Sequence, residues 1–75
     1  MVYAQRLVID PEVRFGKPCV KGTRISVGDV LGFLASGMST SEIVAEYPPL
    51  IADDVLACLS YAADREARTV TLPAA

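Results

Sequence analysis

The 75-residue sequence predicts one small, mainly α domain in which three helices follow a short N-terminal β arm. Two observations carry this prediction. After Ser26, apolar residues recur with helical period and capping residues mark where helices begin. Before Ser26, glycine and proline interrupt short apolar runs instead. We expect a single domain over residues 1–75, with the arm over 1–26, the helical body over 27–67 and a tail over 68–75.

The arm is expected to be extended because its apolar runs are short and are broken by turn residues. Residues 7–9 are a strand candidate that stops at Asp10 and Pro11. Residues 19–20 and 23–25 are further extended candidates, which suggests a small hairpin. Since two short strands are only marginally stable alone, the arm must pack on the helices or pair with another chain.

The first helix is predicted over about residues 27–36. Ser26 and Asp29 have the spacing of a capping box, with aspartate in place of the usual glutamate. Gly37 is placed to end the helix in the left-handed conformation. The apolar stripe of this helix has helical spacing and consists of Val27, Val30, Leu31 and Leu34.

The second helix has the clearest start signal in the chain. Ser39 and Glu42 form a capping box, and Met38 and Ile43 occupy the positions of a hydrophobic staple. The two prolines at 48–49 prevent the helix from continuing, so it is only about eight residues long. The residues expected on its buried side are Ile43, Val44 and Tyr47.

A third helix is predicted over about residues 52–67. Asp53 and Asp54 fall in its first turn, and Arg65 and Arg68 fall near its end, so both pairs complement the helix dipole. With the second helix it has the outline of a helix-turn-helix, although the connection is slightly longer than usual. The residues expected to face inward are Val55, Leu56, Leu59 and Ala63.

Charge is distributed unevenly along the chain, whose net charge is −2. Residues 1–26 carry five basic and two acidic residues, which gives 5 − 2 = +3. Residues 27–75 carry two basic and seven acidic residues, which gives 2 − 7 = −5. A basic arm on an acidic body suggests a polarised surface, and scattered solvated charge is the alternative.

The residue types present argue against catalysis and metal binding. The chain has no histidine to act as a general base near neutral pH. Cys19 and Cys58 lie 39 residues apart, which matches no zinc-ligand spacing, so we expect two buried thiols. We therefore expect no enzyme activity, no metal and no cofactor. The chain has neither a long apolar run nor a basic leader before an apolar core, so the expected location is cytoplasmic.

One stretch of the arm resembles the DUF433 family. Residues 16–25 read GKPCVKGTRI, and this run follows the family's G-K-P-x-V-x-G-T-R-I pattern. The resemblance extends over about residues 7–64. Phe15 stands where the family often has a second glycine, and Ile51 stands where a helix-capping threonine is common. Further matches to the pattern are Gly37-Met38-Ser39, Glu42-Ile43, Glu46-Tyr47-Pro48 and Asp54-Val55.

The resemblance implies a homeodomain-like or winged-helix-like helix-turn-helix with a β arm. It also implies an antitoxin of VapB type from a type II toxin–antitoxin pair. Such a protein binds a PIN-like ribonuclease toxin and, as a homodimer, binds operator DNA to repress its own operon. The candidate DNA-binding residues are Lys17, Lys21, Thr23 and Arg24. The candidate toxin-binding residues are Arg65, Arg68, Val70 and Leu72, the last two on a β-prone tail that could add a strand to the toxin.

Two questions remain open at the level of sequence. Arg24 could form an ion pair with Asp29 or Glu46, or it could contact DNA together with the two lysines. The third helix is a doubtful DNA reader, because Asp53 and Asp54 would face phosphates. The alternative functions are a stand-alone DNA-binding regulator and a dimeric protein-interaction module without a nucleic-acid role.

Overall fold

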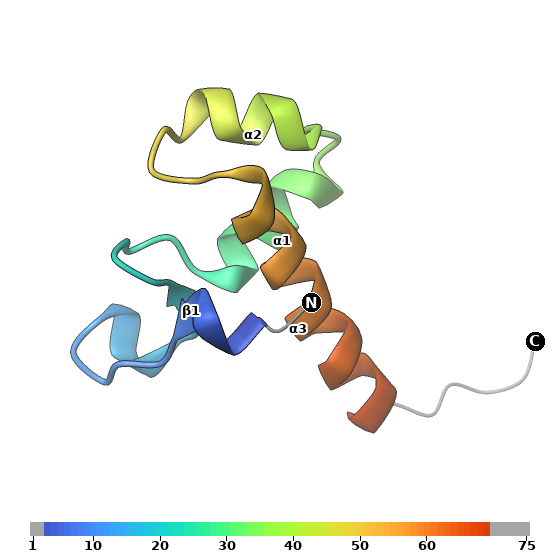
Figure 1. Cartoon of the computed structure of the whole chain (residues 1–75). Coiled ribbons are helices and arrows are strands. Elements are labelled where there is room, and N and C mark those ends of the chain that lie inside the picture. The colour runs from blue at the N-terminus through green and yellow to red at the C-terminus, as the bar shows by residue number, and fades with distance from the viewer. Residues whose placement is uncertain (1–2, 70–75) are drawn as a thin grey trace, which may run out of the picture.

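The computed structural model describes residues 3–69, with side chains up to residue 67, and confirms the mainly α fold (Figure 1). Three helices pack around one core, and a two-stranded antiparallel arm lies against them. The elements in chain order are η1 (Tyr3–Gln5), β1 (Leu7–Val8), η2 (Arg14–Gly16), β2 (Cys19–Val20), α1 (Val27–Ala35), α2 (Thr40–Glu46) and α3 (Ala52–Thr69).

The two strands of the arm are shorter than the sequence suggested. Leu7 pairs with Val20 across the ladder. The prediction of an extended segment over 23–25 is wrong, because this segment belongs to a tight turn. Gly22 has a φ of +79°, and the Thr23 N–H donates to the carbonyl of Val20 at 3.0 Å. The turn closes where the Val20 N–H donates to the carbonyl of Ile25 at 2.9 Å.

The starts of α1 and α2 follow the predicted capping chemistry. The Ser26 hydroxyl accepts from the Asp29 N–H at 2.9 Å, and the Asp29 carboxylate accepts from the Ser26 N–H at 3.0 Å. Ser39 and Glu42 form the same reciprocal pair at 3.1 and 2.9 Å. Because these bonds satisfy amides that lack a partner within the helix, they determine where each helix begins.

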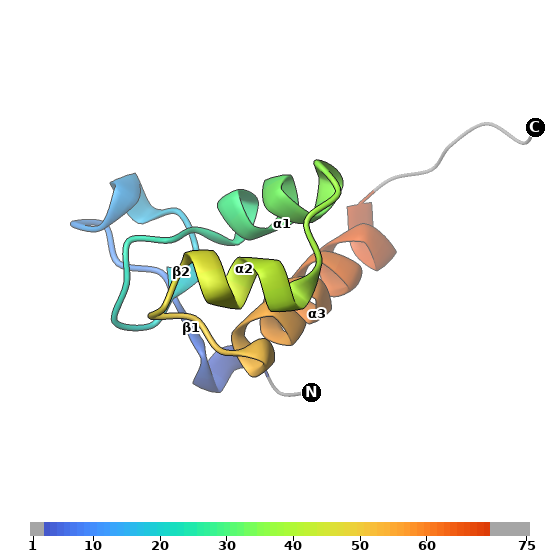
Figure 2. The ribbon, with the colours of Figure 1, turned by 90° about the horizontal axis from the view of Figure 1, so that it is seen from above.

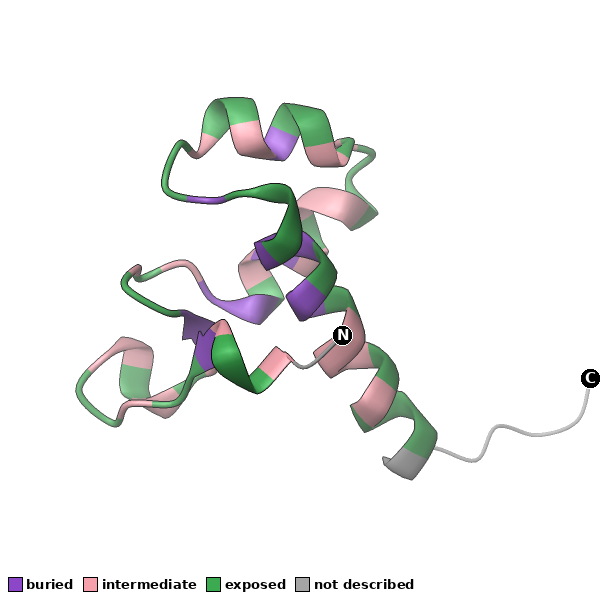
Figure 3. Ribbon diagram, viewed as in Figure 1, coloured by how far each residue is buried: buried purple, intermediate pink, exposed green. Residues whose placement is uncertain are grey.

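The inner face of α3 differs from the prediction. Val55 is buried as expected, but Leu56 is 50% exposed, Leu59 is 42% exposed, and Ala63 is exposed as well. Both faces of this helix carry apolar residues at helical spacing, so periodicity alone could not choose between them. The residues that join Val55 on the inner side are Asp54, Ala57, Cys58 and Tyr61 (Figure 3).

Asp54 explains the rotation of α3, because its carboxylate is held inward. The side chain accepts from Nη1 of Arg6 at 3.1 Å and from the N–H of Ile51 at 2.9 Å. The residue is only 6% exposed. The bond to Ile51 is one half of a capping box, and the Asp54 N–H, which a hydroxyl at position 51 would bind, donates to the carbonyl of Ile51 at 2.9 Å instead. The ion pair with Arg6 fastens the start of the arm to the start of α3.

Every major element contributes to the core. The partly buried aromatics pack around it, with Tyr3 edge-on to Tyr61 at 5.4 Å and Phe33 stacked on Tyr47 at 4.6 Å. No helix in the described part of the chain is both long and apolar enough to cross a membrane. The fully apolar core consists of Leu7, Val20, Val27, Val30, Ile43, Leu50, Val55, Ala57 and Cys58.

Both cysteines are free thiols in buried positions, as predicted. Cys19 lies in β2 and Cys58 lies on the inner face of α3. Burial raises the pKa of the Cys58 thiol to about 11, with a smaller contribution from the negative charge of Asp54. A protonated thiol behaves as a small apolar side chain.

The Asp54 contacts predict a large difference between two adjacent carboxylates. Asp54→Ala should lower the free energy of unfolding by about 2 to 3 kcal/mol, since it removes a buried charge partner and a cap. Asp53 is more exposed and lies 3.5 Å from Arg6, so Asp53→Ala should cost only about 0.5 kcal/mol. Urea unfolding followed by circular dichroism measures both values. Equal costs would contradict the structural role of Asp54.

The Cys58 thiol predicts a loss of stability at alkaline pH. Well below pH 9.0, its ordinary pKa, the thiol is protonated whether the chain is folded or unfolded. As the pH rises from 9.0 toward about 11, the unfolded chain releases this proton first, so the free energy of unfolding should fall. Cys58→Ala should lack this component. Urea unfolding of both proteins across that range measures the difference in their free energies of unfolding, which should be independent of pH well below 9.0.

Candidate functional site

Three basic side chains of the arm are exposed and form no ion pair within the part of the chain that the structure describes. They are Lys17, Lys21 and Arg24, three of the four residues predicted to bind DNA. The other basic residues of the arm, Arg6 and Arg14, are held by carboxylates. The structure therefore separates the basic residues that stabilise the fold from those that face solvent.

Thr23, the fourth predicted DNA-binding residue, is engaged within the turn. Its hydroxyl donates to the carbonyl of Val20 at 2.9 Å and accepts from the N–H of Ile25 at 3.0 Å. Both bonds hold the turn that separates Lys21 from Arg24. Thr23 thus positions the two basic side chains on either side of it.

Asp29 has a different partner from the one expected. Arg14, rather than Arg24, donates to Oδ2 of Asp29 at 2.9 Å. The same Nη1 atom of Arg14 also donates to the carbonyl of Arg24 at 2.8 Å, so one guanidinium joins η2, the turn and α1. No sequence pattern indicates this pair, because the residues belong to segments that only the tertiary fold brings together.

The hydrogen bonds around Asp29 determine its protonation. The pKa of its carboxyl group lies below the usual 3.8, chiefly because the group accepts the Ser26 N–H, and the bond from Arg14 adds to this effect. The carboxylate in turn raises the pKa of Arg14. Asp29 therefore stays ionised at neutral pH and holds both the start of α1 and the arm.

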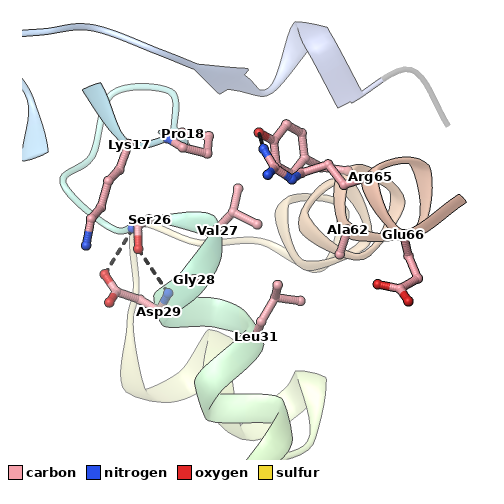
Figure 4. Close-up of a pocket in the computed structure, with 11 residues that line it drawn as sticks. Lys17, Pro18, Ser26, Val27, Gly28, Asp29, Leu31, Ala62, Arg65 and Glu66 are labelled. Atoms are coloured by element: carbon pink, nitrogen blue, oxygen red, sulfur yellow. Dashed lines mark hydrogen bonds between the residues drawn. The ribbon is translucent and has the colours of Figure 1, made fainter. Parts of the chain in front are cut away.

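A groove of about 520 Å³ lies between the arm, the start of α1 and the second half of α3 (Figure 4). It brings together Lys17, predicted to bind DNA, and Arg65, predicted to bind a toxin. Its apolar lining consists of Pro18, Val27, Leu31, Tyr61 and Ala62, and its charged residues are Lys17, Asp29, Arg65 and Glu66.

Arg65 is oriented by an aromatic neighbour. Its guanidinium donates to the Tyr61 hydroxyl at 3.1 Å and lies 5.7 Å from the centre of the same ring. These contacts restrain a long side chain before any partner arrives. Mixed charge around an apolar floor suits a peptide segment, and the described residues hold no cluster of three metal-ligating side chains.

The other predicted toxin-binding positions lie beyond the side chains that the structure describes. The Arg68 side chain, Val70 and Leu72 all fall in that region. The structure adds two features that the sequence did not reveal. One is the outer ridge of α3, where Leu56 and Leu59 are exposed, and the other is Phe15, which is 99% exposed in the arm.

Removing the Asp29 carboxylate should destabilise the protein at neutral pH. Asp29→Ala deletes one half of a capping box and the partner of Arg14, which together should cost about 1 to 2 kcal/mol. This cost should be constant above pH 3.8 and should shrink as the pH falls through the lowered pKa of the folded state. Urea unfolding at several pH values measures it, with the exposed Glu46→Ala as control. If the difference in free energy of unfolding between the wild type and Asp29→Ala stayed the same in acid, the stabilising role of the Asp29 carboxylate would be contradicted.

Comparisons with known proteins place the chain in a family. The family described as "Protein of unknown function (DUF433)" matches residues 7–62. A DUF433 member protein from Anabaena variabilis has a similar structure, with a TM-score of 0.77 and 28% identity over 88% of this chain and 69% of that one. Rv2018 from Mycobacterium tuberculosis is 29% identical, with a TM-score of 0.66 over 76% of this chain. The match spans only 27% of Rv2018, and no protein of curated function matches the chain. The chain belongs to the DUF433 family.

Proposed function

We propose that this protein is the antitoxin of a type II toxin–antitoxin pair, of VapB type, which neutralises a PIN-like ribonuclease and represses its own operon. The observation that carries the proposal is that two kinds of exposed side chain lie on different elements of the fold. Exposed basic side chains that form no ion pair with any described residue lie on the arm, while exposed leucines lie on α3. The tip of the arm and the C-terminal end of α3 lie at opposite ends of the molecule (Figure 2).

The arm is the surface that we assign to operator DNA. Lys17, Lys21 and Arg24 are available for phosphate contacts, and a homodimer would offer 2 × 3 = 6 of them. Contacts of this kind make binding strongly dependent on salt. The turn held by Thr23 fixes the backbone positions from which Lys21 and Arg24 extend.

Helix α3 is poorly suited to reading bases. In a DNA-binding helix-turn-helix, the N-terminal residues of the second helix contact the base edges. In this protein the first turn of α3 carries Asp53, which is exposed, and Asp54, which forms an ion pair with Arg6. A carboxylate in this position repels phosphates, so this chain would depart from the usual docking mode.

The exposed face of α3 supports a homodimer. Leu56 and Leu59 stand between Ala52 and Ala63 along the helix, with spacings of four, three and four residues. This is the spacing by which two helices pack along a common seam. Pairing of two identical seams about a two-fold axis would cover the leucines and bring two arms onto one DNA molecule.

The end of α3 is the surface that we assign to the toxin. PIN-like nucleases hold a metal ion with clustered carboxylates, so an inhibitor can act by bringing a guanidinium into that cluster. Arg65 is exposed and oriented by Tyr61 beside the groove, and Arg68 follows one helical turn later. The tail that carries Val70 and Leu72 would add a strand to the toxin.

Two double variants that each remove two positive charges should separate the two activities. Lys21→Gln with Arg24→Gln should weaken binding to DNA from upstream of the gene, and the salt dependence of log K should decrease by about 0.9 for each phosphate that is no longer neutralised. This variant should still bind the neighbouring nuclease. Arg65→Gln with Arg68→Gln should bind DNA normally and fail to bind the nuclease. Fluorescence anisotropy at several salt concentrations and co-purification of the coexpressed pair measure these effects.

The same experiment distinguishes the alternative functions. DNA binding with no capture of a neighbouring nuclease would indicate a stand-alone regulator. A stable dimer that binds neither would indicate a protein-interaction module. Equal effects of the two double variants on both activities would contradict the assignment of separate surfaces.

A further inference from the structure

Phe15 occupies a position that folding alone does not explain. The side chain is 99% exposed, so it gains nothing from burial. Its backbone has a φ of +59°, within three successive left-handed residues, Arg14 at +52°, Phe15 and Gly16 at +80°. Left-handed geometry is unfavourable for residues that carry a Cβ, and residues held in it concentrate at functional sites.

The surrounding contacts hold Phe15 in this conformation. The Gly16 N–H donates to the carbonyl of Val13 and the Lys17 N–H to that of Arg14, both at 3.2 Å. The Arg14 side chain is anchored at 2.9 Å to Asp29, at the start of α1. An aromatic ring is thus presented to solvent on a turn that is tied to the helical body.

The charge around Phe15 favours a nucleic acid over an apolar protein pocket. Residues 10–24 contain four basic residues, Arg14, Lys17, Lys21 and Arg24, against the two acidic residues Asp10 and Glu12, which gives 4 − 2 = +2. Three of these basic side chains are exposed. An apolar wedge flanked by cations is the combination by which proteins enter a DNA groove, with the cations on phosphates and the wedge against a base step.

We propose that Phe15 is a DNA-contacting residue whose ring packs against a base while the neighbouring cations contact phosphates. This inference rests on the proposed function, since it assigns a specific contact to the arm on DNA. Base stacking on an aromatic ring tolerates different sequences, so Phe15 would strengthen binding without choosing an operator. The left-handed turn keeps the ring exposed before DNA arrives.

Phe15→Gly is a sharp test because glycine favours a φ of +59° and should leave the fold intact or more stable. Fluorescence anisotropy is measured with a set of overlapping duplexes that covers the DNA upstream of the gene. Phe15→Gly should bind these duplexes with an affinity about tenfold lower than that of the wild type. The salt dependence should not change, because the ring carries no charge. The Lys21 and Arg24 double variant should instead lower that dependence. Wild-type affinity in Phe15→Gly would overturn the inference and leave the proposed function in place.

Phe15→Trp gives a direct readout, since the chain contains no tryptophan. Its emission should be quenched when the same duplexes are added, whereas Ala45→Trp, on an exposed position of α2, should not respond. If the variant bound DNA and the emission of its tryptophan at position 15 were not quenched, the proposed contact with a base would be overturned. Loss of nuclease capture by Phe15→Gly with unchanged DNA affinity would assign the ring to a protein pocket instead. If the wild type did not bind DNA, both this inference and the proposed DNA binding would be overturned. Capture of the nuclease by the same protein would still support the proposed antitoxin role.

Discussion

The ion pair between Arg6 and Asp54 is the contact on which the arrangement of this small domain depends. It joins the start of the arm to the start of α3 across 48 positions of sequence. Because Asp54 is buried and also caps α3 at Ile51, the same carboxylate sets where α3 begins and which face of it turns inward. The outward direction of Leu56 and Leu59 follows from that orientation. The surface of the protein is therefore partly a consequence of one buried charge.

A second ion pair repeats this logic at the other side of the arm. Asp29 caps α1 and receives Arg14, just as Asp54 caps α3 and receives Arg6. In both cases an acidic residue at the third position of a helix caps that helix and also forms an ion pair with the arm. This double use commits two basic residues of the arm to carboxylates of the helices. The three that remain exposed define the face that we assign to DNA.

Local chemistry explains which features were predictable. The starts of α1 and α2 depend on side chains three residues apart, so Ser26 with Asp29 and Ser39 with Glu42 could be recognised directly. The fold class and the buried thiols followed from periodicity and composition in the same way. The inward face of α3 could not be predicted, since its two apolar stripes differ only in their tertiary partners. Pairing of Asp29 with Arg14, and the exposure of Phe15, likewise depend on contacts between distant segments.

The thin connection between arm and body also has a consequence for dynamics. Over residues 3–25, full burial is confined to Leu7, Cys19 and Val20, and the side-chain bonds to the helices come from Tyr3, Arg6 and Arg14. Segments with little buried surface open at lower free energy than the core, so amides of the arm should exchange with deuterium well before those of α1. A polyanion bound to the arm would slow that exchange by adding free energy to its closed form. If the arm binds DNA as we propose, its exchange rate would report occupancy independently of any change in the helices.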